Sequence, residues 1–339
     1  MLEERTAHSM EIIKFNDSYI SEVVKLWNKS CSTEMPYKLF TEQSFKEKFI
    51  NNPHFSYEGT FVAVKDEKVI GFANGLFKKE FLPGETFENT PGYLTFVLVD
   101  KEHRNRGYGS RLLKAVEDFL INSGKKMIQI IFFNPINLEW YIPGSENTHD
   151  HPNAPGVDVE GPGFEFFKRH GYVVRTNEVS MYLDLAKFKL DEKSIRKMEE
   201  LKDKGINIEY YDEDKHHGFD DLFDDLKNEL WRKEIKDNLA LNNSFPVIVA
   251  SDNGYICGFT GPIEIQESGR GKFSGIGVDS KHQGLGIGKL LFFMLCESFK
   301  KEGAGFMSLF TGIDNNARRM YEAAGFNVVK TWAVMRKEV

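Results

Sequence analysis

Two glycine-rich segments of this chain could bind a phosphate group through their backbone. Val99–Gly109 reads VDKEHRNRGYG and Val278–Gly288 reads VDSKHQGLGIG, and each position of the second lies 179 residues after its counterpart (283 against 104). Glycine lets an anion approach the free N–H groups at a helix N-terminus, where the helix dipole is positive. The repetition also indicates two copies of one structural unit.

Two other phosphate-binding motifs do not describe these turns. A dinucleotide fingerprint needs G-x-G-x-x-G and an acidic residue about twenty positions further on. Here the spacing is x-x-G-x-G, and the acidic residue near that distance after the second turn, Glu302, lies at the polar end of the following helix. A Walker loop needs Gly-Lys followed by Ser or Thr. Gly288-Lys289 is followed by Leu290, which cannot hold magnesium.

Both turns closely resemble the Q/R-x-x-G-x-G/A pyrophosphate loop of the GNAT acetyltransferases, as Arg104–Gly109 and Gln283–Gly288. The segment Asp314–Phe326 is similar to the motif on the last helix of that family. The resemblance spans nearly the whole chain. It implies a mixed α/β fold with two tandem GNAT-like acyl-CoA N-acyltransferase domains, and acetyl-CoA as cosubstrate in the gap where two parallel strands separate.

The resemblance also implies which residues contact the coenzyme. Asn315 has a second candidate role as the N-cap of the helix that carries Tyr321. The expected contacts are Arg104, Arg106, Gly107, Tyr108 and Gly109 in the first copy, and Ile276, Gly277, Val278, Gln283, Gly284, Leu285, Gly286, Ile287, Gly288, Lys289 and Asn315 in the second.

The two copies differ where the family carries its proton donor. Acetyl transfer from a thioester to an amine expels a thiolate, and a nearby acid assists that departure. The resemblance places Tyr321 in this role, four residues before Gly325, whereas the first copy has Phe167, which cannot donate a proton. We therefore expect the second domain to be catalytic and the first to be degenerate, although its turn could still bind coenzyme.

A general base is the other requirement, because an amine of pKa about 10.4 is almost fully protonated at pH 7. In related enzymes the base often comes from the hairpin strand before the coenzyme strand, where Glu264 lies between Ile263 and Ile265. Strand alternation places Glu264 on the face opposite these two neighbours. Glu264 as the base and Glu264 as a solvated strand residue both remain open.

Hydrophobic periodicity places these residues in two domains, residues 1–190 and 205–339, joined by a connecting helix at 191–204. In the first domain it predicts strands at 11–15, 61–64, 69–77, 94–99, 127–133 and 173–183, and helices at 18–29, 42–50, 107–122 and 164–170. In the second it predicts strands at 206–210, 246–250, 256–265, before the turn, at 306–310 and ending near 336, and helices at 219–238, after the turn to 301 and around 321.

The first domain also contains a long loop, residues 134–163, whose prolines and glycines forbid regular structure. Its histidines, His149 and His151, could bind a metal together with an aspartate, or could bond backbone groups of an ordered loop. We favour the ordered loop and expect no metal. So long an insertion could also form a wall of the second domain's substrate site.

Composition limits the remaining possibilities. The 339 residues are 41% hydrophobic and 28% charged, without a run of eighteen apolar residues or a signal-like N-terminus. Three widely separated cysteines fit neither a disulfide framework nor a zinc site. The net charge of −7 disfavours nucleic acid and suits a cationic amine. We expect a cytoplasmic monomer or homodimer without a membrane partner.

These observations predict an acetyl-CoA-dependent N-acetyltransferase that moves an acetyl group to a primary amine of a small molecule or peptide by direct attack. Two alternatives remain open: an acetyl-CoA-binding regulator without enzymatic activity, and an acyltransferase that uses hydroxyl acceptors or longer acyl chains. The acceptor pocket varies within the family, so the acceptor does not follow from the sequence.

Overall fold

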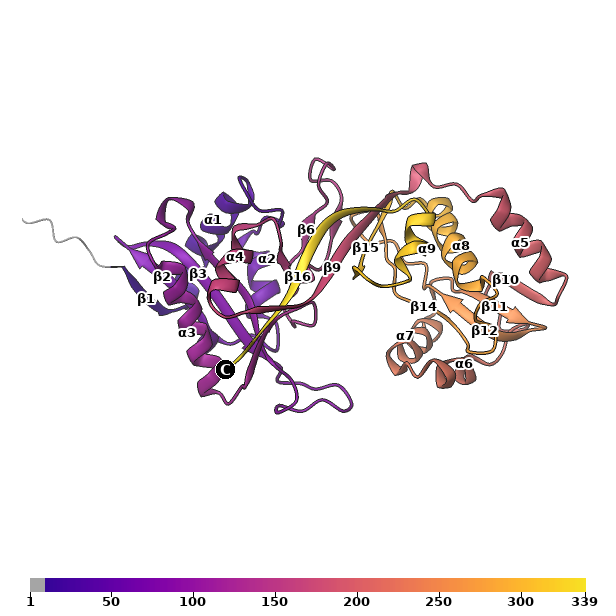
Figure 1. Cartoon of the computed structure of the whole chain (residues 1–339), viewed down its shortest axis with the longest axis horizontal. Helices are drawn as coiled ribbons and strands as arrows, with labels where there is room; N and C mark the ends of the chain where they lie inside the picture. Colours follow the sequence, from indigo (N-terminus) through magenta and orange to yellow (C-terminus); the bar gives the residue numbers. More distant parts are fainter. Residues whose placement is uncertain (1–9) are drawn as a thin grey trace, which may run out of the picture. The chain divides into compact units, whose positions relative to one another are not determined.

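The computed structural model describes residues 10–339, which form two compact units (Figure 1). The first unit contains the chain up to Gly144, residues 151–178 and residues 330–339, and the second contains residues 145–150 and 179–329. This division differs from the continuous domains 1–190 and 205–339 expected from the sequence. The reason is that two long strands, β9 (Val173–Asp184) and β16 (Asn327–Glu338), each begin in one unit and end in the other.

The first unit is a mixed sheet with helices on both faces, and its strands follow the order β1-β2-β3-β4-β5-β16-β9. Its strands are β1 (Glu11–Lys14), β2 (Thr60–Lys65), β3 (Lys68–Phe77), β4 (Gly92–Val99), β5 (Met127–Ile130), β6 (Trp140–Tyr141) and β8 (Val157–Asp158), together with parts of β9 and β16. Its helices are α1 (Ile20–Cys31), α2 (Glu42–Phe45), which continues as a π-turn over Lys46–Ile50, α3 (Tyr108–Asn122) and α4 (Pro162–Arg169). The short strand β7 (Asp150–His151) lies where the chain passes back from the second unit.

Alternation along the strands divides the core of this unit in two. Val62 and Phe72 pack with α1 and α2, whereas their neighbours Ala63 and Ala73 pack with α3. Successive strand residues point to opposite faces, so both faces of β2 and β3 are apolar and each needs its own helical cover. The helix after the glycine turn therefore lies on one face of the sheet, and the α1–α2 pair lies on the other.

Strands β4 and β5 are parallel neighbours for only two residues, Gly92 and Tyr93, which pair with Ile128 and Gln129. Beyond this point the two strands separate. A long insertion then interrupts β5, and β8 takes over its place against β16: β5 pairs with Met335–Glu338, and β8 pairs with Trp332 and Ala333. The side of the gap that faces β4 is therefore formed by β8, which lies near the end of the insertion.

The second unit repeats this layering. Its helices are α5 (Glu192–Lys202), α6 (Phe219–Leu226), α7 (Glu229–Leu239), α8 (Ile287–Lys301) and α9 (Arg318–Ala323). Its strands are β10 (Ile206–Tyr210), β11 (Ile248–Asp252), β12 (Tyr255–Thr260), β13 (Arg270–Gly271), β14 (Ile276–Val278) and β15 (Phe306–Gly312), together with parts of β9 and β16. The order β10-β11-β12-β14 forms one antiparallel sheet, while β13 pairs in parallel with β15. Helices α6 and α7 cover one face of β11 and β12, and α8 covers the other.

Two predicted elements of the second unit end earlier than the periodicity indicated. The single helix predicted at 219–238 is two helices, because Lys227 adopts a left-handed conformation (φ 52°) and Asn228 caps α7 by accepting a hydrogen bond from the Trp231 N–H. The strand predicted to reach residue 265 stops at Thr260, since Gly261 has φ 113° and Pro262 has no N–H to donate to a ladder.

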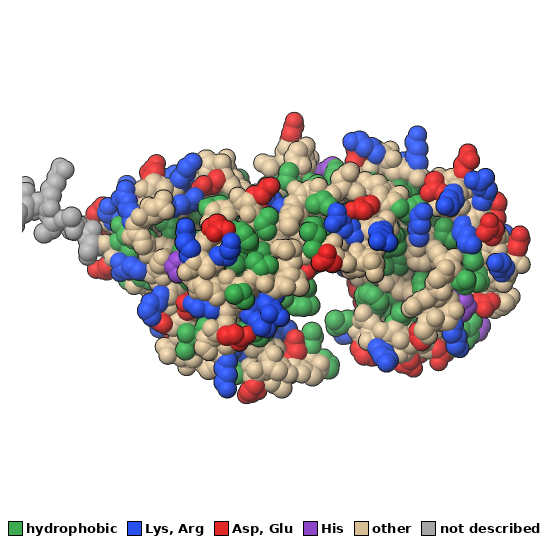
Figure 2. Space-filling view, viewed as in Figure 1, with side chains coloured by type: hydrophobic (Ala, Val, Ile, Leu, Met, Phe, Trp, Pro, Cys, Tyr) green, Lys and Arg blue, Asp and Glu red, His purple; other side chains and the backbone are tan. Residues whose placement is uncertain are grey.

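The surface carries charges of both signs, interspersed over the visible face of each unit (Figure 2). Such mixing, with the net charge of −7, gives no extended basic face of the kind that tracks a phosphate backbone on the side shown. Within residues 10–339, no helix combines the length and apolar character needed to cross a bilayer.

Candidate active site

Both glycine turns have the predicted strand–turn–helix geometry. Gly107 (φ 80°) caps α3 and Gly286 (φ 84°) caps α8, and neither helix has a side-chain cap at its N-terminus. A Cβ atom added at either glycine would meet no atom within 4 Å. The left-handed backbone favours glycine at both positions, and open space lies beside the free N–H groups of both helices.

The first side chain of each turn folds back onto the strand before it. Arg104 Nε donates to the Val99 carbonyl at 3.0 Å, and Gln283 Nε2 donates to the Val278 carbonyl at 3.4 Å. Arg104 also binds both carboxylate oxygens of Glu34, at 2.9 and 2.7 Å. This bidentate ion pair ties the first turn to the segment after α1, and the second turn has no arginine to do the same.

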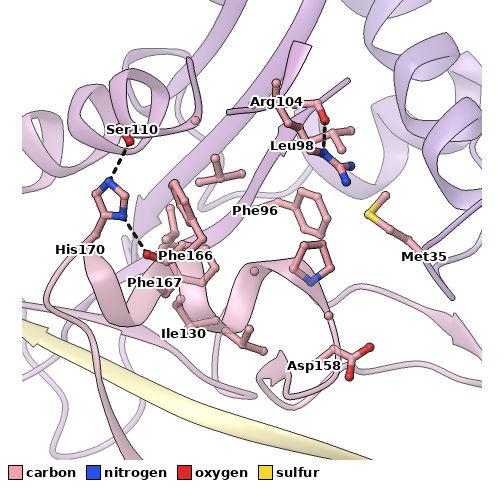
Figure 3. A pocket seen from close by; sticks show the side chains of 18 of the residues that line it. Met35, Phe96, Leu98, Arg104, Ser110, Ile130, Asp158, Phe166, Phe167 and His170 are labelled. Atoms are coloured by element: carbon pink, nitrogen blue, oxygen red, sulfur yellow. Dashed lines mark hydrogen bonds between the residues drawn. The ribbon is translucent and has the colours of Figure 1, made fainter. Parts of the chain in front are cut away.

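A cavity of about 380 Å³ occupies the first unit where β4 and β5 separate (Figure 3). Its lining comprises Leu94–Val99 of β4, Gly107, Gly109 and Ser110 at the start of α3, Gly156–Asp158 around β8, one side of α4, and Glu34–Tyr37 from the α1–α2 connection. Arg104, Gly107 and Gly109, three of the expected coenzyme contacts, line it. Arg106 and Tyr108 belong to the same turn without lining the cavity. The cavity thus lies in the unit that the sequence indicated to be degenerate.

One end of the cavity is polar and lies at the start of α3. Ser110 Oγ is 2.9 Å from His170 Nε2, and His170 Nδ1 is 2.8 Å from the Phe166 carbonyl (Figure 3). A carbonyl can only accept, so Nδ1 carries a proton, and in the neutral imidazole Nε2 accepts from the Ser110 hydroxyl. Arg169 also lines the cavity and adds positive charge, whereas the charge of Arg104 is paired with Glu34.

The other end is mainly apolar, with two carboxylates that already have cationic partners. Met35, Phe96 and Leu98 form its walls (Figure 3). Glu34 is paired with Arg104, and Asp158 is paired with Lys330 at 2.6 Å. Since both carboxylates are neutralised by the protein, this end presents apolar surface with little net negative charge.

Sequence reasoning missed the residues at this end. Glu34–Tyr37 follow a helix without any motif, and Asp158 reaches the cavity only because β8 continues the interrupted β5. The available signal is the long loop at 134–163, for which a wall of the second domain's substrate site is one possible role in the sequence analysis. Asp158, near its end, lies in the first unit.

In the second unit, Tyr321 lies on α9 with 7% of its surface exposed. Its ring packs against those of Phe292 (5.0 Å between centroids), Phe273 (6.1 Å) and Phe326 (6.2 Å). Burial raises the pKa of its phenol. Phe273 is the counterpart of Leu94 at the 179-residue offset, so the second unit has the larger side chain at this position. The role of Tyr321 as an acid stays a prediction.

Helices α6 and α7 pack closely against one face of β14 and the residue before it. A Cβ atom at Gly275 would meet the Trp231 indole at 2.6 Å, and one at Gly277 would meet Leu226 at 2.5 Å. These glycines are needed because α6 and α7 lie directly on the strand. Only Lys227 and Asn228 connect the two helices, so the second unit has no counterpart of the Glu34–Tyr37 segment.

Glu264 and Asn315 are both engaged within the second unit. Glu264 lies beyond the end of β12 and pairs with Lys272 at 2.8 Å, with 29% of its side chain exposed. Asn315 accepts from the Ala317 N–H at 2.9 Å, one residue before α9 begins, so it orders the helix entry without being its N-cap. Their roles as base and coenzyme contact stay predictions.

The loop histidines bond to groups of the protein itself. His149 belongs to the second unit, where it stacks on Phe306 (4.0 Å, 11°) and its Nδ1 lies 2.7 Å from the Tyr182 hydroxyl. His151 Nδ1 lies 2.8 Å from the Asn153 carbonyl. Across residues 10–339, no three His, Cys, Asp or Glu side chains are placed to hold a metal ion together.

The model of the acetyltransferase (GNAT) family matches residues 21–141 and 207–326. No curated protein matches the chain.

Three solved structures share its fold. One is a GCN5-related glucosamine N-acetyltransferase region of a fungal multi-domain GH3 β-N-acetylglucosaminidase, with 15% identity and a TM-score of 0.66 over 98% of this chain and 38% of that one. The second is a GCN5-related N-acetyltransferase from Sphaerobacter thermophilus, with 14% identity and a TM-score of 0.60 over 97% and 95%. The third is a tandem GNAT protein from the clavulanic acid biosynthesis pathway, with 13% identity and a TM-score of 0.55 over 97% and 98%. The chain thus spans 38% of the first of these proteins and nearly all of the other two.

Proposed function

Because the chain belongs to the acetyltransferase (GNAT) family, with two tandem domains, we propose that it transfers the acetyl group of acetyl-CoA to a primary amine and that the first unit performs the transfer. The cavity between β4 and β5 carries this proposal. The cavity runs from the N-terminus of α3 to an apolar end lined by Glu34–Tyr37. It therefore offers room for both acetyl-CoA and the amine.

The polar end suits the phosphates of acetyl-CoA. Free N–H groups at the start of α3 attract anions, and Arg169 adds a positive charge. Along Leu94–Val99, the edge of β4 that faces the gap has no partner strand, since pairing with β5 ends at Tyr93. This edge offers backbone donors and acceptors to the amide groups of the pantetheine arm.

The apolar end favours an acceptor with an apolar body and one amino group. Both carboxylates there are already ion-paired, so an acceptor with several positive charges would find little uncompensated negative charge. The amine would attack the acetyl carbonyl directly. The C–N bond forms, the C–S bond breaks, and one proton moves in net terms from nitrogen to sulfur. Small-molecule amines and peptide N-termini both meet this description.

Catalysis by the second unit through Tyr321 is the rival assignment. Its support is the intact turn at Gly286, with open space for an anion. The packing of Tyr321 among three phenylalanine rings and the lack of a segment equivalent to Glu34–Tyr37 favour the first unit instead.

The matched variants Gly107→Asp and Gly286→Asp separate the two assignments. Both glycines have nearly the same φ and both have open space for a side chain, so the backbone strain is matched and the added carboxylate repels a phosphate in each.

Thiol release from acetyl-CoA with a panel of primary amines is the assay. We expect Gly107→Asp to abolish turnover and Gly286→Asp to retain most of it. The reverse pattern would assign catalysis to the second unit. Acetyl-CoA binding without turnover of any amine would indicate a regulator.

A further inference from the structure

The first unit lacks the family's phenol on α4, yet a different phenol reaches the same cavity. Phe167 occupies the position of Tyr321 and is 8% exposed in the cavity wall. Among the described residues that line this cavity, Tyr37 is the one tyrosine. It comes from the α1–α2 connection, on the opposite side of β4 from α4. A phenol is thus available to this site from another element.

Tyr37 is held in place from several directions. Its ring packs edge-to-face on Phe96 (5.4 Å, 86°) and against Trp27 (5.6 Å). Its backbone bridges to Trp140 of the insertion, and the neighbouring Pro36 carbonyl accepts from the Tyr141 N–H at 2.7 Å. The insertion that interrupts β5 therefore fixes Tyr37 beside the reaction cavity.

The same insertion delivers Asp158 to this cavity. Its Oδ1 accepts from the Glu160 N–H at 3.0 Å, and its Oδ2 lies 2.6 Å from Lys330 Nζ. The side chains of Asp158 and Lys330 are 20% and 12% exposed, so the pair is only partly screened by water. Burial, and next the negative charge of Asp158, raise the pKa of the Tyr37 phenol. Tyr37 therefore keeps its proton at neutral pH, and its side chain and that of Asp158 line the same cavity.

We propose that Tyr37 and Asp158 form the proton relay of the first unit, an assignment that rests on the proposed function. As the amine nitrogen bonds to the acetyl carbon it becomes strongly acidic, and its proton passes to the Asp158 carboxylate. As the C–S bond breaks, the Tyr37 phenol gives its proton to sulfur. Asp158 then returns its proton to the Tyr37 phenolate. The cycle moves one proton from nitrogen to sulfur and restores both side chains, while Lys330 positions Asp158.

Kinetics with chemically matched substrates test the relay. The donors are acetyl-CoA and its analogue with oxygen in place of the thioester sulfur, whose alkoxide needs a proton more than a thiolate does. The acceptors are 2-phenylethylamine and the far less basic phenylhydrazine. We expect Tyr37→Phe to lower kcat about 10²-fold with acetyl-CoA and more with the oxygen ester. We expect Asp158→Asn to lower it about 10²-fold with 2-phenylethylamine and less with phenylhydrazine. The KM for acetyl-CoA should change little.

Conservative variants separate chemistry from packing. Lys330→Arg should keep turnover and Lys330→Met should lose it, because only arginine retains the ion pair. Tyr141→Phe, on the neighbouring strand and outside the cavity lining, should behave as wild type. Losses in Tyr37→Phe or Asp158→Asn that are equal for both donors or both acceptors would overturn the relay.

NMR of tyrosine labelled at Cζ provides a test that needs no acceptor. The Tyr37 signal is the one lost in Tyr37→Phe, and we expect it to begin ionising at lower pH in Asp158→Asn than in wild type. An unchanged titration would overturn the relay.

Failure of the relay and failure of the proposed function are distinguishable. If Gly107→Asp abolishes turnover while Tyr37→Phe and Asp158→Asn retain it, only the relay fails. If Gly107→Asp retains turnover, the proposed site itself is wrong.

Discussion

In the first unit, residues 32–41 connect α1 and α2 and place Glu34–Tyr37 on the cavity, whereas in the second only Lys227 and Asn228 connect α6 and α7. On the other side of the gap, Leu94 of the first unit corresponds to Phe273 of the second. Yet the two glycine turns and the helices that follow them are nearly identical in backbone conformation. Each turn depends on two left-handed residues, Asn105 and Gly107 in the first and Gly284 and Gly286 in the second, while the cavity depends on the loops and side-chain volumes around it.

Two features of the chain point to different units. The tyrosine on the last helix favours the second unit, and the cavity favours the first. We propose that Tyr321 is a packing residue, held against Phe273. We also propose that the proton donor of the first unit comes from another element, since Phe167 carries no hydroxyl.

Among the variants that test this comparison, Gly156→Ala, at the junction of the insertion with β8, should have the largest effect on stability. A Cβ atom there would lie 2.4 Å from the Ala333 carbonyl oxygen, so the backbone must shift. We expect a loss of about 2 kcal/mol or more in the free energy of unfolding and a fall in turnover of at least about tenfold, because Asp158 moves with β8. Urea unfolding and the thiol-release assay measure the two. Wild-type turnover would show that β8 does not position the reacting groups.

Phe273→Leu gives the second unit the residue that the first unit has at this position. Loss of ring contacts with Tyr321 and Phe292 should cost about 1–2 kcal/mol of unfolding free energy. Turnover at a temperature where the variant stays folded should not change, since the α6–α7 connection still supplies no acceptor segment. A gain of activity that depends on Gly286 would show that Phe273 alone blocks a second active site.

Arg104→Gln places glutamine in the first turn, as at the equivalent position Gln283 of the second turn. It removes the bidentate contact with Glu34, whose side chain is 20% exposed, and should cost about 1 kcal/mol of unfolding free energy. The difference from wild type should shrink as salt is added, because the lost interaction is electrostatic. Thermal unfolding at two ionic strengths checks this, with Gln283→Arg as the control. A salt-independent difference would mean that Arg104 acts through packing.

Tyr321→Phe should have the smallest effect. The ring and its three aromatic contacts are kept, and we expect kcat and the midpoint of unfolding to stay close to wild type. Steady-state kinetics with acetyl-CoA and the fastest amine of the panel provide the measurement. A fall in kcat of about 10²-fold, with chemistry rate-limiting, would restore Tyr321 as the acid of a catalytic second unit.

The sequence predicted the features that depend on local rules. Both turns and their helices follow from glycine spacing and a period of 3.6, and the tandem fold follows from the repeat. The helix break at Lys227 and Asn228 had a local signal, an asparagine with the N-cap preference, which the apolar periodicity of 219–238 masked. The resemblance assigns Tyr321 the role of acid, which stays a prediction, and its packing against Phe273 becomes visible only in the structure.

The rest of the candidate site depends on long-range pairing. Asp158 reaches the cavity because β8 continues the interrupted β5 against Trp332 and Ala333, which lie more than 170 residues further along the chain. Tyr37 is fixed by a bridge to Trp140. No periodicity within a window of the sequence carries such register information, so strand pairing across an insertion becomes visible only in the structure.

A crystal structure of the wild-type protein grown with coenzyme A tests the central claim most directly. We predict that the diphosphate lies at the N-terminus of α3, beside Gly107, and that the thiol lies in the gap between β4 and β8, facing Tyr37 and Asp158. Coenzyme bound at α8 alone, with its thiol against Tyr321 and the first cavity empty, would contradict the account and assign catalysis to the second unit.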